Sequence, residues 1–110
     1  MNLSNGTEIA NCASIADTFF KRLKGLMFTK SLKTGHGLYI QPCQSIHTFF
    51  MNYSIDILYL SEMLEIVGID EKMEPKKIGK YYRAAASVLE LPAGTIQNTN
   101  TSVGHYLSIN

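Results

Sequence analysis

Four short segments rich in β-branched and aromatic residues follow one another between residues 37 and 70. They read GLYIQ, SIHTFFM, IDILYL and LEIVGID, and turn-forming residues separate them. Such residues favour extended backbone, and short apolar runs between turn formers are typical of consecutive strands. We therefore predict four strands here, paired in an up-and-down antiparallel order.

Three more strands are expected outside this stretch. Residues 7–13 alternate weakly near the start of the chain, residues 85–91 form a further apolar segment, and residues 105–109 read HYLSI near the end. Six or seven short strands with few helices are typical of an α+β domain dominated by sheet.

Two helices are predicted. Apolar residues at spacings of three and four indicate a helix over residues 15–24. They are Ile15, Phe19, Phe20, Leu23 and Leu26 or Met27. Ser14 followed by Asp17 resembles a capping box at its start. A short second helix is expected over residues 92–98, because proline suits the first turn of a helix.

The predicted fold is a single small curled antiparallel sheet or small barrel with one or two short helices, in the α+β, mainly β class. Strands that are apolar on both sides need cover on both faces, which favours a curled arrangement. A chain of 110 residues buries roughly two thirds of its unfolded surface. We therefore expect one domain over residues 1–110, with no metal or disulfide staple.

The two cysteines, Cys12 and Cys43, share no close spacing. This argues against a disulfide framework and against a zinc knuckle. We expect each to be a small buried hydrophobe, and the sequence predicts no metal and no cofactor.

No apolar run reaches the ~20 residues that a membrane-spanning helix requires. The first residues, MNLSNGTEIANCAS, lack the basic start and apolar stretch of a secretory signal. A cytoplasmic location is the expectation.

The ten Lys and Arg residues fall into two windows, residues 21–33 and residues 72–83. Glu74 is the single acid in either window, although the net charge of the chain is only +1. That net charge excludes the whole-protein basic field typical of nucleic-acid binding. The windows are either two solvated faces or, if they meet in space, one anion-attracting surface.

Several ordered motifs carry a resemblance to a known family. They are RLKGLM at residues 22–27, Gly37-Leu38, PCQSIHTFFMNYSIDILYL at residues 42–60, VLELPAGTI at residues 88–96, and Gly104. Over about residues 13–107 the chain resembles the bacterial and archaeal family called domain of unknown function 192. The resemblance implies a small, mostly β domain and no established activity.

The chain departs from the family pattern at two places. His105 stands where the family usually has an acid after the late glycine, and residues 61–64 read SEML where an Asp-Gly turn is common. Any role for the late acid therefore does not carry over to this chain.

His47 and Asp56 stand out within the apolar residues 45–60. An acid-base pair would require contact at about 3 Å. In a hairpin with its turn at residues 52–54, side-chain alternation places the two on opposite faces. Other turn lengths leave them about 13 Å apart along the strands. We therefore expect no catalytic dyad.

Cys43 and His47 are four residues apart, which would make them neighbours on a helix but not on a strand. An enzyme that uses Cys43, His47 and Asp56 is the alternative hypothesis. It would require a fold that brings the three side chains together.

A buried Asp56 would need hydrogen-bond donors. Backbone N–H groups beside a turn are one source, and the planar guanidinium of Arg22 is another. We predict an Arg22 to Asp56 contact.

His47 has two readings. Either its ring nitrogens are satisfied by backbone or hydroxyl oxygens, or it lines a pocket with Ser45 and with Thr48 or Tyr59. The first hypothesis is a non-enzymatic module that binds a small anionic ligand or a protein partner. Its predicted ligand-binding residues are Arg22, Ser45, His47, Thr48 and Asp56, and no residue is assigned a catalytic role. A third hypothesis is single-stranded nucleic-acid binding, to which Tyr81-Tyr82-Arg83 would contribute stacking.

Glu90 alternates with Leu89 and Leu91. This pattern predicts that Glu90 points outward from a strand. Arg22 and Arg83 are its possible partners.

Overall fold

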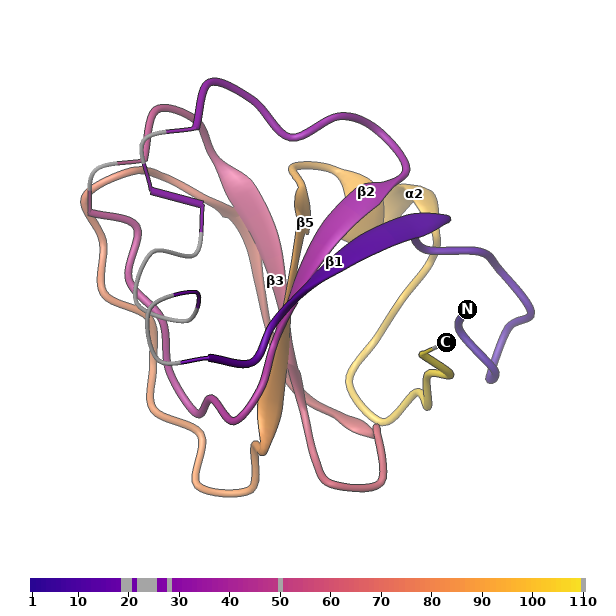
Figure 1. Ribbon diagram of the computed structural model, residues 1–110. Coiled ribbons are helices and arrows are strands. Elements are labelled where there is room, and N and C mark those ends of the chain that lie inside the picture. Colours follow the sequence, from indigo (N-terminus) through magenta and orange to yellow (C-terminus); the bar gives the residue numbers. More distant parts are fainter. Residues whose placement is uncertain (19–20, 22–25, 28, 50, 110) are drawn as a thin grey trace.

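The computed structural model describes residues 1–18, 21, 26–27, 29–49 and 51–109 (Figure 1). Among these residues the structural elements are five strands and one short helix. They are β1 (Cys12–Ala16), β2 (His36–Ile40), β3 (Ile55–Leu60), β4 (Ile66–Met73), β5 (Ser87–Pro92) and α2 (Thr95–Asn98). The predicted α+β, mainly β class is confirmed.

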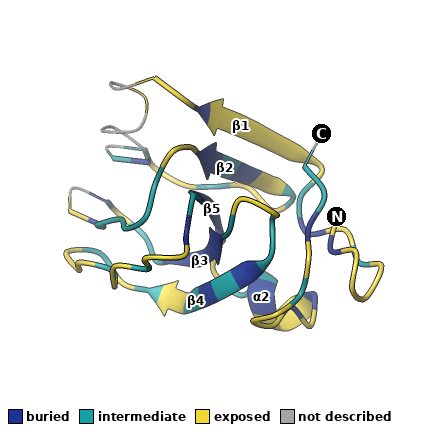
Figure 2. Cartoon of the chain, turned by 90° about the horizontal axis from the view of Figure 1, so that it is seen from below, coloured by how far each residue is buried: buried dark blue, intermediate teal, exposed yellow. Residues whose placement is uncertain are grey.

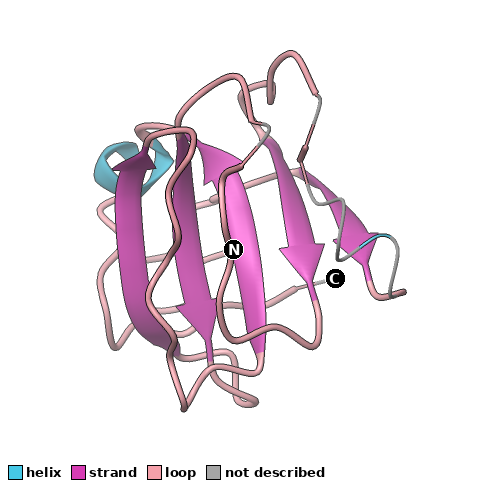
Figure 3. Cartoon of the chain, turned by 90° about the vertical axis from the view of Figure 1, so that its left-hand side faces the viewer, coloured by secondary structure: helices cyan, strands magenta, loops and turns pink. Residues whose placement is uncertain are grey.

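The strands form one twisted sheet in the order β1-β2-β5-β3-β4 (Figure 3). β1 and β2 are parallel, and the other neighbouring pairs are antiparallel. Within the described residues the sheet stays open, since β1 and β4 are its two edges. The up-and-down order predicted from the sequence is wrong, because β5 lies between β2 and β3.

The strand predicted for SIHTFFM, residues 45–51, is also wrong. β5 takes the place beside β3 that this segment was expected to fill. The described residues of this segment instead lie over one face of the sheet as a loop, and His47 forms an isolated bridge with Ile78. Its apolar residues Ile46 and Met51 contribute to the core by covering the sheet, which explains an apolar pattern without strand pairing.

The first strand begins later than predicted, at Cys12 rather than residue 7. Ile15 and Ala16 therefore belong to β1, and the helix predicted to begin at residue 15 does not begin there. Residues 19, 20 and 22–24 of that helix lie outside the described residues.

Near the C-terminus the short helix is confirmed as α2. Pro92 closes β5 instead of opening this helix. The last predicted strand is reduced to two isolated bridges, which join Tyr106 to Glu65 and Leu107 to Asn2.

Both faces of the sheet are covered. All six residues of β3 are buried, and the five side chains other than Asp56 divide between two core clusters. One face, which we call the loop face, packs Ile55, Ile57 and Tyr59 beneath the connections that include Ile46 and Met51. The other, the termini face, packs Leu58 and Leu60 with residues from α2 and the two chain ends. Figure 1 shows the loops on one side of the strands and both termini with α2 on the other.

Candidate functional site

Asp56 is fully buried and holds two backbone groups. Its Oδ1 accepts the N–H of Lys72 and its Oδ2 accepts the N–H of Ile96, both at 2.8 Å. The expectation that a buried Asp56 finds backbone donors is confirmed. Arg22 lies outside the described residues, so the Arg22 to Asp56 contact stays a prediction.

Thr48 and Ser45 also bind backbone. The buried Thr48 hydroxyl donates to the carbonyl of Glu74 at 2.7 Å and accepts the N–H of Lys77 at 2.8 Å. The Ser45 hydroxyl donates to the carbonyl of Gly79 at 3.2 Å. Both side chains therefore fasten the segment after β4 to residues 45–48, and their role toward a ligand stays a prediction.

Backbone hydrogen bonds continue this attachment along both segments. Thr48 N–H donates to Lys77 at 2.8 Å, and Lys76 N–H donates back to Thr48 at 3.0 Å. The N–H of Gly79 and of Tyr82 donate to Ile46 and Gln44 at 2.8 and 3.0 Å. We call residues 44–49 together with residues 76–83 the basic ladder. It brings the second window of cations beside His47.

His47 lies within this ladder and is partly exposed. Its Nδ1 accepts the N–H of Phe49 at 3.2 Å, so in the neutral ring the proton lies on Nε2. The His47 and Phe49 rings are tilted, with centroids 5.5 Å apart. One ring nitrogen is thus satisfied by a backbone N–H and not by the oxygens that one reading expected, and a role of His47 toward a ligand stays a prediction.

The outer surface of the ladder combines apolar and positive side chains. Phe49 is exposed, and Ile78 and Tyr81 are 73% and 66% exposed. The Tyr81 hydroxyl donates to Gln44 Oε1 at 3.0 Å, which fixes the ring at this surface. The exposed cations of the ladder are Lys76, Lys77, Lys80 and Arg83.

The first basic window begins elsewhere. It follows β1, whereas the second window begins at the end of β4, and these strands are opposite edges of the sheet. Lys21, Lys30 and Lys33 are exposed, and the other two cations of this window lie outside the described residues. A surface shared by both windows stays a prediction.

Cys43, His47 and Asp56 are engaged in different places. Cys43 packs against the loop face, and its thiol donates to the carbonyl of Ser45 at 3.0 Å. Asp56 alternates with Ile55 and Ile57, which also point to the loop face, so its carboxylate lies on the termini face. The sheet therefore separates Cys43 from Asp56, and the triad of the enzyme hypothesis is not assembled.

Neither cysteine is fully buried. Cys12 is exposed because it lies on the edge strand β1, and Cys43 is partly exposed. The expectation of two buried cysteines is wrong. Cys43 lines a shallow hollow of about 470 Å³ together with Pro42, Gln44, Glu62, Ala85 and Ala86.

A tyrosine cluster on the loop face was not foreseen from the sequence. The buried Tyr59 donates to Asp70 Oδ2 at 2.8 Å, and its ring lies 4.2 Å from that of Tyr82. Burial, and then the hydrogen bond to Asp70, raises the pKa of Tyr59. Gly68, which pairs with Tyr59 across the strands, leaves room for the Tyr82 ring. The signal in the sequence was a glycine inside a predicted strand.

Glu90 was predicted to point outward and is instead buried, with 2% of its surface exposed. It lies on the middle strand β5, which Figure 2 shows as buried between β2 and β3. Alternation does not imply an exposed face when both faces are covered. No described residue donates to its Oε1, and burial raises the pKa of Glu90 to about 8.

The described part of the chain contains no helix with the length and apolar character needed to cross a membrane. Nor do the described His, Cys, Asp and Glu residues form a group of three suited to a metal ion.

Comparison with known proteins places the chain among uncharacterised relatives. The chain is 33% identical over 109 residues to a UPF0127 protein of Thermococcus sibiricus, covering 94% of this chain and 70% of the relative. A UPF0127 protein of Pyrococcus furiosus is 30% identical over 115 residues, and this match covers 100% of this chain and 97% of the relative.

Two solved structures share the fold. A protein of unknown function from Novosphingobium aromaticivorans superposes with a TM-score of 0.80 at 18% identity, covering 88% of this chain and 74% of that one. A protein from Sinorhizobium meliloti, described as a candidate transcription regulator, gives a TM-score of 0.79 at 25% identity, with coverage of 87% and 79%. The family model described as uncharacterized ACR matches residues 2–109, so the chain belongs to the family DUF192.

Proposed function

We propose that this domain is a non-enzymatic binding module whose basic ladder docks on an acidic surface of a partner protein. The observation that carries the proposal is the run of backbone hydrogen bonds between residues 44–48 and residues 76–82. This run fixes His47 and a window of cations on one surface.

Charge favours a negatively charged partner. Residues 72–83 contain five cations and one acid, Glu74. Four of these cations lie on the ladder itself and are exposed. Complementary charge across an interface accelerates association and excludes wrong partners, so a concentrated positive surface favours an acidic one opposite.

Exposed apolar side chains favour a protein over a small anion. Phe49, Ile78 and Tyr81 are exposed beside the cations, and aromatic residues with arginine are enriched at the centre of protein interfaces. A small ligand would instead need a concave site. The hollow that reaches the ladder at Gln44 is also lined by Glu62, an acid that would repel an anion.

Nucleic acid is the competing polyanion. The same cations would contact phosphates, and Phe49 and Tyr81 would offer rings for stacking. The description of the Sinorhizobium meliloti protein as a candidate transcription regulator makes an oligonucleotide a necessary arm of the test.

The experiment is an NMR titration of the ¹⁵N-labelled protein with a synthetic peptide of alternating Glu and Phe. Shift changes are expected at residues 44–49 and 76–83. Lys77→Glu combined with Lys80→Glu should weaken binding roughly tenfold by reversing two exposed charges. The matched control, Lys30→Glu with Lys33→Glu, should bind as the natural protein does.

Three outcomes would contradict the proposal. Shift changes at other residues would exclude the basic ladder as the binding surface. An equal loss of affinity in both double variants would show unspecific charge attraction. If an oligothymidine of similar charge binds more tightly than the peptide, the partner is single-stranded nucleic acid and not a protein.

A further inference from the structure

β1 is an edge of the sheet that nothing in the described part of the chain covers. Cys12, Ala13, Ser14 and Ile15 are all exposed, and 50% of the Ile15 surface is accessible. Figure 2 shows β1 as the outermost strand, exposed along most of its length. An edge strand presents unpaired N–H and C=O groups, which can pair with another strand.

The pairing of β1 with β2 fixes which backbone groups point outward. The N–H of Cys12 and the carbonyl of Ala16 form hydrogen bonds, at 3.0 and 3.2 Å, with the residues that flank β2. Residues that bond to one neighbouring strand alternate along a strand, so the backbone of Ser14 also faces β2. The N–H and carbonyl groups of Ala13 and Ile15 therefore point away from the sheet.

The opposite edge, β4, is protected from such pairing. Residues 104–105 form hydrogen bonds with Ile66 at its start. Its far end carries Glu71 and Lys72, and Pro75 follows it. Charged side chains and proline are common means by which proteins prevent pairing at sheet edges. β1 contains neither, so it is the edge that remains open to another strand.

β1 is complementary to a second copy of itself. In an antiparallel pair centred on Ser14, Ala13 lies opposite Ile15 of the second copy, and Ile15 lies opposite Ala13 of the second copy. These are the residues whose backbone groups point outward, so each opposed pair exchanges two hydrogen bonds. Every outward-facing group of Ala13 and Ile15 is then paired in both copies. A pair centred on Ala13 or on Ile15 would instead place the other residue opposite a position outside β1.

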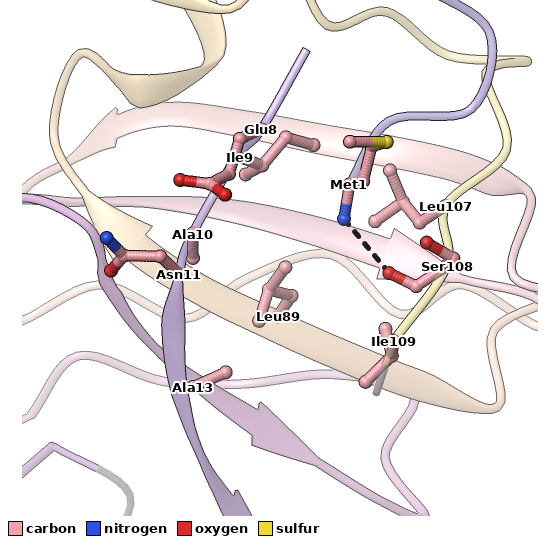
Figure 4. Close-up of a pocket in the computed structure, with 10 residues that line it drawn as sticks. All are labelled: Met1, Glu8, Ile9, Ala10, Asn11, Ala13, Leu89, Leu107, Ser108 and Ile109. Atoms are coloured by element: carbon pink, nitrogen blue, oxygen red, sulfur yellow. Dashed lines mark hydrogen bonds between the residues drawn. The ribbon is translucent and has the colours of Figure 1, made fainter. Parts of the chain in front are cut away.

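The side chains fit in the same register. Opposed residues of an antiparallel pair lie on the same face of the sheet. Here it is the termini face, where Ala13 and Leu89 line a hollow of about 290 Å³ (Figure 4). The large side chain of Ile15 from the second copy would lie against the small Ala13 beside this hollow. The contact would remove apolar surface of both copies from water.

Charge also favours a second copy as the occupant. β1 carries no charged side chain, and the first one after it, Asp17, would lie opposite Asn11 of the second copy. Like charges directly opposite each other destabilise a strand pair, and this register contains none within residues 11–17. A second copy meets these conditions by symmetry, whereas an unrelated strand would have to reproduce the pattern by its own sequence.

We infer that two copies of this chain associate through antiparallel pairing of their β1 strands, with Ser14 on the two-fold axis. The two sheets then form one continuous sheet. The interface is small, so the dimer is weak and depends on protein concentration. It contains no residue of the basic ladder, and failure of one proposal leaves the other standing.

Sedimentation equilibrium over a wide range of concentrations tests the association. The mass of the natural protein should rise with concentration toward that of a dimer. Ile15→Lys should weaken the association roughly tenfold, because both symmetric contacts of Ile15 are lost and a charge enters the edge. Val103→Lys is the matched control, at an apolar residue that is 55% exposed outside β1. It should associate as the natural protein does.

Cross-linking tests the register. Ser14→Cys, in a background of Cys12→Ser and Cys43→Ser, places two thiols at a non-hydrogen-bonded pair whose Cα atoms are ~4.5 Å apart, which suits a disulfide. Oxidised glutathione should convert this variant to a covalent dimer, since the two thiols are oxidised as one glutathione disulfide is reduced. With Cys43→Ser alone, the natural Cys12 lies opposite Ala16 and about 13 Å from its counterpart. It should cross-link roughly tenfold more slowly or not at all.

Thermal unfolding checks that each variant is folded, and Cys12, Ser14 and Ile15 are exposed. The inference is overturned if the natural protein stays monomeric at the highest concentration reached, which would leave this edge to a strand of another protein. It is also overturned if Ile15→Lys associates as tightly as Val103→Lys, or if Cys12 cross-links as fast as the Ser14→Cys variant.

Discussion

The carboxylate of Asp56 accepts the N–H of Ile96 at 2.8 Å, so a residue inside the sheet holds the only turn of α2 in place. Its second oxygen holds Lys72 of β4 at the same distance. One buried side chain thus connects β3, β4 and α2.

Asp56→Ala should therefore destabilise the fold strongly. It leaves the N–H groups of Lys72 and Ile96 without their acceptor, and the expected loss is about 3 kcal/mol of unfolding free energy. Urea unfolding measures it. Glu71→Ala, which removes an exposed acid from the neighbouring strand, is the comparison. A loss at Asp56 no larger than at Glu71 would contradict the assignment.

Glu90 should give the fold a distinct pH dependence. Its pKa is raised from 4.5 to about 8 by burial, so the folded state binds this proton more tightly than the unfolded state. The stabilisation is fully present below the unfolded pKa and is lost as the pH rises through about 8. At ~1.4 kcal/mol per pKa unit the loss amounts to a few kcal/mol.

Glu90→Gln should flatten this profile, because the amide keeps the neutral shape and does not ionise. Urea unfolding at about pH 5, 7 and 9 measures the difference, which should be largest at the highest pH. Glu62→Gln, at an exposed acid, should leave the profile unchanged. A steep profile that persists in Glu90→Gln would show that another group is responsible.

Gly68→Ala should destabilise the tyrosine cluster, because any Cβ at this position meets the Tyr82 ring. Overpacking of this kind costs roughly 1–3 kcal/mol. In a background of Tyr82→Ala the same change should cost much less, since the ring that it displaces is gone. Additive losses in the double-mutant cycle would contradict direct contact.

Thr48→Val should loosen the basic ladder without changing its charge. The variant keeps the shape of the side chain but loses the hydroxyl that accepts the N–H of Lys77 and donates to Glu74. We expect faster hydrogen exchange at Lys77 and a loss of roughly 1–2 kcal/mol. Thr48→Ser, which retains the hydroxyl, should keep slow exchange, and equal exchange in both variants would refute this role.

The sequence predicted the segments of β2, β3, β4 and β5 because their residues favour extended backbone. It did not predict the position of β5, since strand order depends on contacts between distant parts of the chain. Residues 45–51 show the same limit. An apolar run can fill a core as a loop that lies across a sheet, and local composition does not distinguish this from a strand.

The candidate site was predictable where a local rule applied. A buried Asp56 needs donors wherever it lies, and backbone donors were found. The prediction that Glu90 points outward was wrong because it assumed that one face of the sheet is exposed to solvent. Thr48 and Ser45 were identified as polar positions of interest, but their backbone partners lie about thirty residues away in the sequence and could not be foreseen.

The central place of β5 also constrains when this chain can fold during synthesis. β5 is the strand that pairs with both β2 and β3. Until Pro92 has left the ribosome, no complete strand therefore links the pair β1 and β2 to the pair β3 and β4. The nascent protein then holds two separate ribbons, and two-stranded ribbons are marginally stable in water. The complete sheet can therefore assemble only after the last strand, β5, has been synthesised, because β5 lies between β2 and β3.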